Sequence, residues 1–232
     1  MANFASPAIL GSFLLWTNLY LLLWAFLRHL RQSEATAESA CRAVTVLHAL
    51  LLSGLGLASM FFFGPWPFDA NNLAKPNTQL HTDTIVLSLG YFLFDFSWCV
   101  LTKTEGLVML LHHAVSIFGF GYVLRSGRYG CEATGVLGVS ELTNPLLQLR
   151  WFLKRGGLYS GAVERAVDWT FATLFCCIRL GIGSAFFLFV LFPASQVETV
   201  VRLGSTGFYV ISIIFSFQIA LYMYNKYLKN II

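Results

Sequence analysis

Seven stretches of this chain are long enough and apolar enough to cross a lipid bilayer, and they constrain the fold more than any other feature. A helix needs about 20 apolar residues, each rising 1.5 Å, to span the hydrocarbon. The stretches are residues 8–27, 42–63, 84–101, 107–124, 130–153, 168–192 and 203–224. Only 11% of the residues are charged, against about 25% in a soluble domain. The sequence therefore predicts an all-α, polytopic transmembrane bundle of about seven helices.

Lysine and arginine in the connecting loops predict the orientation. If the N-terminus is outside, nine of them fall in cytoplasmic loops and four in outer loops. The positive-inside rule then predicts a lumenal or extracellular N-terminus and a cytoplasmic C-terminus. Residues 1–7 lack a basic segment, so 8–27 is expected to be a retained first helix. Because the net charge of +4 is spread over many loops, we expect no nucleic-acid partner.

Several spans also carry ionisable side chains, which are costly in lipid. They are His48, Asp95, His112, His113, Glu141 and Arg179. Counting 1.5 Å per residue from the predicted cytoplasmic ends places them all in one half of the bilayer, at depths of roughly 8 to 18 Å. An isolated charge at mid-bilayer costs about 2.5 to 3.5 kcal/mol, so we expect these groups to face one shared cavity. Arg179 would pair with Glu141 or Asp95; the alternative is a buried ion pair that only fixes helix register.

The fifth span contains a polar face next to a proline. Glu141, Asn144 and Gln148 are spaced i, i+3 and i+7, which places them on one side of a helix. Pro145 cannot donate a hydrogen bond to the Glu141 carbonyl, so a kink is expected there. The result would be a polar notch in the cavity wall. A packing kink with hydrogen bonds between helices is the alternative.

His112 and His113 are adjacent inside the fourth span. Their side chains diverge by about 100° on a helix, so together they are poor ligands for one metal ion, and we expect no metal site. One ring would face the cavity, and Ser116, one turn on, would orient His112. A histidine near a carboxylate can act as a general base or as a nucleophile toward an acyl group. The alternative is a core histidine whose hydrogen bonds are satisfied and which does no chemistry.

These residues resemble the TLC domain family. The resemblance is carried by Tyr-Phe-Leu-Phe-Asp at 91–95, the His112-His113 pair, Ser140-Glu141 with Asn144-Pro145, and Arg179. It implies a helical bundle around a membrane-embedded cavity, with residues 1–40 as a first helix and cytoplasmic loop and 41–232 as the TLC domain. It also implies a location in the endoplasmic reticulum or another endomembrane.

The best-known members of that family, the ceramide synthases, transfer an acyl group from acyl-CoA to a sphingoid base. The resemblance maps their double histidine onto His112 and His113 as catalytic residues. Their pair of aspartates on the next helix is not reproduced, because Ser140, Glu141 and Asn144 stand there.

Three functions follow as hypotheses. The first is a protein of lipid homeostasis that binds or processes a membrane lipid or fatty-acyl chain. Its cavity residues would be His48, Asp95, Ser116, Glu141, Asn144, Gln148 and Arg179. The second is a ceramide-synthase-like acyltransferase with acyl-CoA as substrate and no cofactor. The third is a membrane receptor or adaptor without catalysis.

Overall fold

A computed structural model describes residues 2–31 and 36–229, which form helices joined by loops and one isolated β-bridge between Pro76 and Arg128. The predicted first cytoplasmic loop falls partly on residues 32–35, which lie outside the described residues. Six helices are long and apolar enough to cross a membrane: Pro7–Leu30, Thr36–Phe63, Gln79–Thr102, Leu107–Ser126, Gly161–Leu191 and Thr199–Leu228. The predicted all-α multi-pass bundle is confirmed in this part of the chain.

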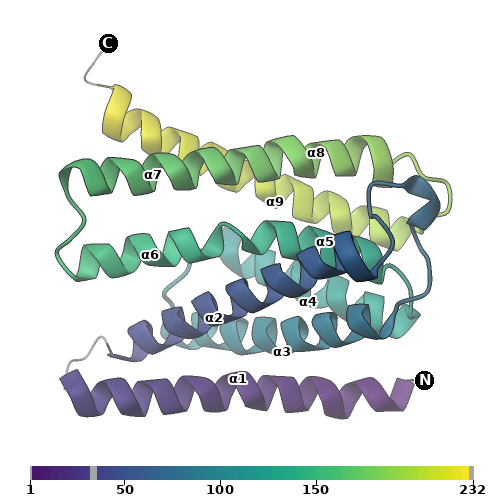
Figure 1. Ribbon diagram of the computed structural model, residues 1–232, viewed down its shortest axis with the longest axis horizontal. Helices are drawn as coiled ribbons and strands as arrows, with labels where there is room; N and C mark the ends of the chain where they lie inside the picture. The colour runs from purple at the N-terminus through teal and green to yellow at the C-terminus, as the bar shows by residue number, and fades with distance from the viewer. Residues whose placement is uncertain (1, 32–35, 230–232) are drawn as a thin grey trace.

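The helices form an elongated bundle with α1 along one side and α7 and α8 along the opposite side (Figure 1). Their bounds are α1 Ala2–Arg31, α2 Thr36–Ala58, α3 Gln79–Thr102, α4 Leu107–Ser126, α5 Gly130–Glu141, α6 Asn144–Arg155, α7 Gly161–Cys176, α8 Gly183–Ala185 and α9 Thr199–Met223. α1 packs on α3 and α2, α2 on α5 and α6, and α9 on α4 and α7. The segments that carry most of the ionisable residues therefore lie between the outer helices.

The predicted span 130–153 is two helices rather than one. α5 ends at Glu141 and α6 begins at Asn144, and the two run end to end in Figure 1. Pro145 lies in the first turn of α6, where its missing N–H costs no helical hydrogen bond. The helix is interrupted at Leu142 and Thr143, which both keep right-handed helical dihedral angles. The disturbance expected at Pro145 therefore takes the form of a short interruption just before the proline.

α2 and α5 approach most closely at two glycines. A Cβ built on Gly56 would lie 2.5 Å from the Cα atom of Gly138 and 2.6 Å from the Thr134 carbonyl oxygen. Small residues allow helix backbones to come this close, and van der Waals contact then holds them together in the membrane. The contact positions His48 of α2 beside Glu141 of α5, with 3.7 Å between Nδ1 and Oε2.

Four segments in the described chain contain π-helical turns: Ser59–Phe63, Cys177–Ile182, Phe186–Leu191 and Tyr224–Leu228. Such turns occur often at functional sites, because the extra residue redirects the side chains around it. The segment Cys177–Ile182 contains Arg179. Nothing in the apolar pattern of the sequence predicts this local change of helix geometry.

The proline-rich loop after α2 folds back against α5. The Cys131 thiol donates a hydrogen bond to the Pro65 carbonyl at 3.1 Å, and Pro67 packs against Gly135. Pro67 and Phe68 also line the apolar cavity inside the bundle. The loop therefore closes one end of that cavity.

Candidate functional site

Two cavities of opposite character adjoin inside the bundle. The apolar chamber, of about 220 Å³, is lined mainly by apolar and aromatic side chains such as Phe68, Val115 and Phe187. The polar chamber, of about 570 Å³, lies toward the α3–α4 turn and is lined by groups such as Glu105 and Asp95. Both chambers are lined by Phe92, His112, Ser140, Glu141 and Arg179. These five residues mark the junction.

Seven of the nine site residues named from the sequence line the polar chamber: Asp95, His112, His113, Glu141, Asn144, Gln148 and Arg179. Ser116 lines the apolar chamber instead, and within the described residues no hydrogen bond joins it to His112. His48 lines neither chamber and lies behind Glu141. The reason is its place on the buried face of α2, where its exposure is 0%.

His48 supports the junction from behind. Its ring stacks on Tyr91 with 3.6 Å between centroids, and its Nε2 atom lies 3.4 Å from the Ser88 hydroxyl. The Glu141 carboxylate accepts a hydrogen bond from the Asn144 amide at 2.8 Å on the same oxygen that His48 approaches. Glu141 is therefore fixed across the break between α5 and α6, which leaves its carboxylate at the junction of the chambers.

His112 is the histidine that faces both chambers. Its ring lies beside Phe208 and Phe215, with centroid separations of 5.5 and 6.0 Å. No side chain among the described residues hydrogen-bonds to this ring. Its nitrogens are thus not committed to the protein, and a group bound at the junction could use them as an acceptor, donor or nucleophile.

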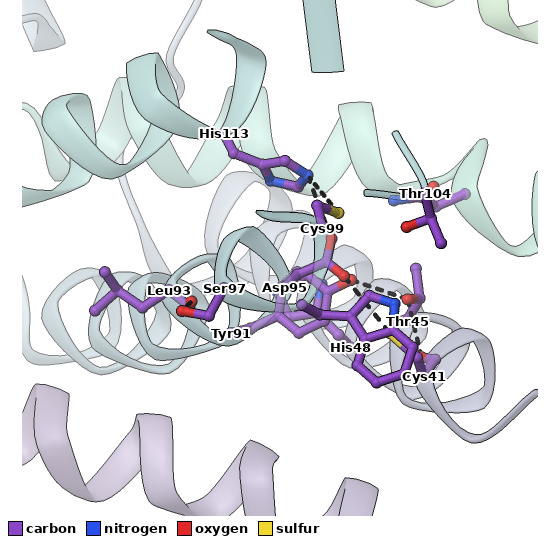
Figure 2. Close-up of polar contacts among 12 residues, drawn as sticks. Cys41, Thr45, His48, Tyr91, Leu93, Asp95, Ser97, Cys99, Thr104 and His113 are labelled. Atoms are coloured by element: carbon purple, nitrogen blue, oxygen red, sulfur yellow. Dashed lines mark hydrogen bonds and ion pairs between the residues drawn. The ribbon is translucent and has the colours of Figure 1, made fainter. Parts of the chain in front are cut away.

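His113 points to a different set of partners (Figure 2). Its Nε2 atom lies 3.4 Å from Oδ2 of Asp95 and 4.0 Å from Sγ of Cys99, while Cys41 contacts the other Asp95 oxygen at 3.8 Å. Asp95 and Cys99 are one turn apart on α3, and His113 comes from α4 across a short turn. The sequence analysis did not single out Cys99, although its i, i+4 spacing from Asp95 was a usable signal.

Arg179 differs from the expectation that it would pair with Glu141 or Asp95. In the described chain no carboxylate lies within ion-pair distance of its guanidinium, which sits over the rings of Phe175 and Phe208 at 5.3 and 5.4 Å. Its Nε atom is buried and has no hydrogen-bond partner. The carboxylates contact His48 and His113 instead, and Glu141 acts on Arg179 only through longer-range electrostatic attraction. The Arg179 guanidinium therefore has no direct ion-pair partner at the junction in the described chain.

The outer part of the polar chamber is held by α2 and α6. The Gln148 amide oxygen accepts a hydrogen bond from Arg42 at 3.0 Å, and Arg42 also pairs with Glu38 at 2.9 Å. The Arg42 guanidinium lies over the Trp151 ring at 4.7 Å. Gln148 thus positions the Arg42 guanidinium at the wall of the polar chamber. The polar notch expected from the sequence did not include this cation.

Asp168 anchors the helices at the open end of the polar chamber and was missed as a site residue. Its carboxylate is 1% exposed and accepts hydrogen bonds from Lys226 at 2.7 Å, Tyr227 at 2.8 Å and Tyr159. It also forms an ion pair with Arg150, with 2.8 Å between Nε and Oδ1. Burial and the hydrogen bond to Asp168 raise the pKa of the Tyr159 phenol, so it stays protonated and donates. The network ties α6, α7 and the C-terminal segment together.

No solved structure matches this chain. A family model does match it: that of the TLC domain, named for TRAM, LAG1 and CLN8, aligns with residues 38–229. This region contains both chambers and every residue that lines them. With six apolar helices long enough to cross a membrane in its described part, the chain is a multi-pass membrane protein that belongs to the TLC domain family.

Proposed function

We propose that this protein binds or processes a membrane lipid or fatty-acyl chain, with the polar head in the polar chamber and the acyl tail in the apolar chamber. The observation that carries the proposal is the junction, where an apolar cavity and a polar cavity share His112, Glu141 and Arg179. An amphipathic ligand is the kind of molecule that fills both at once.

The polar chamber would supply the selectivity. An acyl tail gains almost nothing by leaving the bilayer for an apolar cavity, because lipid tails are as apolar as the cavity wall. Hydrogen bonds and charge therefore have to hold the ligand. Arg179 would bind an anionic or carbonyl oxygen of the head, while Glu141 and Asn144 would bind hydroxyl or amine groups.

The experiment fills the apolar chamber without disturbing helix packing. Gly204 of α9 lines this chamber, and a Cβ built on it meets no atom within 4 Å. Gly204→Leu should therefore fold normally while its side chain occupies the space of a tail. Gly54→Leu is the matched control, since Gly54 is also free of neighbours within 4 Å but lines neither chamber.

Lipid that co-purifies with each variant is extracted and quantified by mass spectrometry. We expect wild type and Gly54→Leu to carry the same enriched lipid and Gly204→Leu to lose it. Equal enrichment in all three proteins would refute binding in the apolar chamber. Arg179→Gln should still bind lipids with the same acyl tails but prefer a different head group. This variant therefore tests the polar chamber separately.

An acyltransferase of the ceramide synthase type is the second candidate, favoured by the place of His112 at the junction. Its imidazole would attack the thioester carbonyl of acyl-CoA, the C–S bond would break to release CoA, and an acceptor amine would then take the acyl group and lose a proton. His112→Ala should abolish a lipid conversion in cells while the protein accumulates and still binds lipid. Unchanged conversion would refute this role.

We also propose a location in the endoplasmic reticulum or another endomembrane and a part in lipid homeostasis. The loop charges support a cytosolic opening of the polar chamber. Within the family, we propose a resemblance to TLC domain-containing protein 5. The chain has no Asn-x-Ser/Thr acceptor. One inserted in the loop of residues 64–78 should be glycosylated, whereas one inserted beside Lys103 should not. The reverse pattern would refute the orientation.

A further inference from the structure

Three different kinds of metal-binding side chain meet where α3 packs against α4. Asp95 and Cys99 project from one face of α3, and His113 projects toward them from α4 (Figure 2). One ligand atom from each lies within 4.8 Å of the other two. All three residues line the polar chamber.

The separations fit a shared ion better than a direct hydrogen bond. Nε2 of His113 and Oδ2 of Asp95 are 3.4 Å apart, which is longer than the 2.7 to about 3.2 Å of a good N–H···O bond. In a tetrahedral zinc site, bond lengths of about 2.1 Å place nitrogen and oxygen ligands about 3.4 Å apart, and sulfur and nitrogen about 3.6 Å apart. The observed sulfur–nitrogen distance is 4.0 Å and the sulfur–oxygen distance is at most 4.8 Å, so the Cys99 side chain has to move toward the other two ligands to complete the geometry.

We propose that Asp95, Cys99 and His113 bind a zinc ion. A thiolate, an imidazole and a carboxylate are the three ligand types that Zn²⁺ takes in proteins, whereas Mg²⁺ and Ca²⁺ take oxygen ligands. The earlier expectation of no metal considered His112 and His113 as a chelating pair. The structure directs only one of them into this set.

The site keeps one coordination position open. Three protein ligands are the arrangement of zinc sites that bind a water or a substrate atom, and structural sites usually have four. The fourth position here faces the polar chamber, where an oxygen of a bound head group or a water would complete the sphere. Cys41 contacts Oδ1 of Asp95 rather than the ligand atom Oδ2, so it helps to orient the carboxylate without binding the ion.

The test measures metal in the intact, full-length protein, purified with its affinity tag removed. Cys99→Ser removes the thiolate. Cys131→Ser is the matched control, because Cys131 and Cys99 are both 4% exposed and only Cys99 belongs to the ligand set. Zinc is counted by elemental mass spectrometry after dialysis against a defined Zn²⁺ buffer.

We expect about one zinc ion per chain in wild type and in Cys131→Ser, and an affinity at least about tenfold lower in Cys99→Ser, since even the loss of a group that only orients a ligand costs this much. Equal zinc in Cys99→Ser and wild type would overturn the proposal. Co²⁺ substitution gives a readout in the wild-type protein that needs no variant. A thiolate-to-cobalt charge-transfer band is expected, and its absence would also overturn the site.

The zinc site goes beyond the proposed lipid function and fails separately from it. Retained lipid with no zinc would refute the metal and leave the chambers intact. Bound zinc with no retained lipid would refute lipid binding in the chambers and leave the zinc site intact.

Discussion

Replacing Gly56 by alanine should destabilise the bundle at the close contact between α2 and α5. The added Cβ would lie 2.5 Å from the Cα atom of Gly138 and 2.6 Å from the Thr134 carbonyl oxygen. Both are backbone atoms that cannot rotate away, so α2 and α5 have to separate. Overpacking of this kind costs about 1 to 3 kcal/mol. For a chain of this size, that corresponds to a fall of roughly 2 to 12 °C in Tm.

The control for this substitution is Gly54→Ala, two residues away on the same helix. A Cβ on Gly54 meets no atom within 4 Å, and alanine is a better helix former than glycine by about 1 kcal/mol. Gly54→Ala should therefore equal or exceed wild type. Both variants are heated in detergent, and the folded fraction is followed by size-exclusion chromatography with fluorescence detection. Equal Tm values for Gly56→Ala and Gly54→Ala would refute the close approach of α2 and α5.

Two further substitutions test the ends of the helices. Asp168→Asn should cost about 3 kcal/mol, because it leaves Arg150 and Lys226 facing an uncharged group in a buried network. The control is Glu164→Gln, because Glu164 pairs with the same Lys226 but is more exposed. This substitution should cost less than about 1 kcal/mol. Equal losses in Tm for the two variants would contradict a central role for Asp168. Lys103→Gly should raise stability by roughly 0.5 to 1 kcal/mol, since Lys103 ends α3 with φ at +54° and glycine adopts that conformation without strain. A lower Tm for Lys103→Gly would contradict this assignment of the helix end.

The spans could be predicted from the sequence because apolar runs of bilayer length have few other stable solutions. The break between α5 and α6 could be predicted only as a disturbance at Pro145. A proline marks where a helix loses a hydrogen bond, but neighbouring packing decides whether the helix bends or stops. The start of α9 also differs from the predicted 203–224, because the helix begins at Thr199, one turn before the predicted apolar span, and ends at Met223.

The sequence predicted that the ionisable side chains gather inside the bundle. It did not predict which of them pair with one another. The free-energy cost of placing a charged side chain in lipid predicts that Asp95 and Glu141 point into the bundle. It does not predict which side chain each of them contacts. The π-helical turn at Cys177–Ile182 sets the direction of Arg179, and nothing in the apolar pattern reports that turn. His48 was harder to place from the sequence. The sequence does not distinguish a buried histidine that packs behind a carboxylate from one that lines a cavity.

Photo-crosslinking tests most directly whether an amphipathic ligand lies across the two chambers. Cells expressing the protein are fed a fatty acid that carries a photoactivatable group, and labelled peptides are identified after irradiation. We expect labels on chamber-lining residues such as Val115 and Phe208, lost in Gly204→Leu and kept in Gly54→Leu. Labels confined to outward-facing residues such as Phe62 and Phe189, and unchanged by Gly204→Leu, would contradict the account.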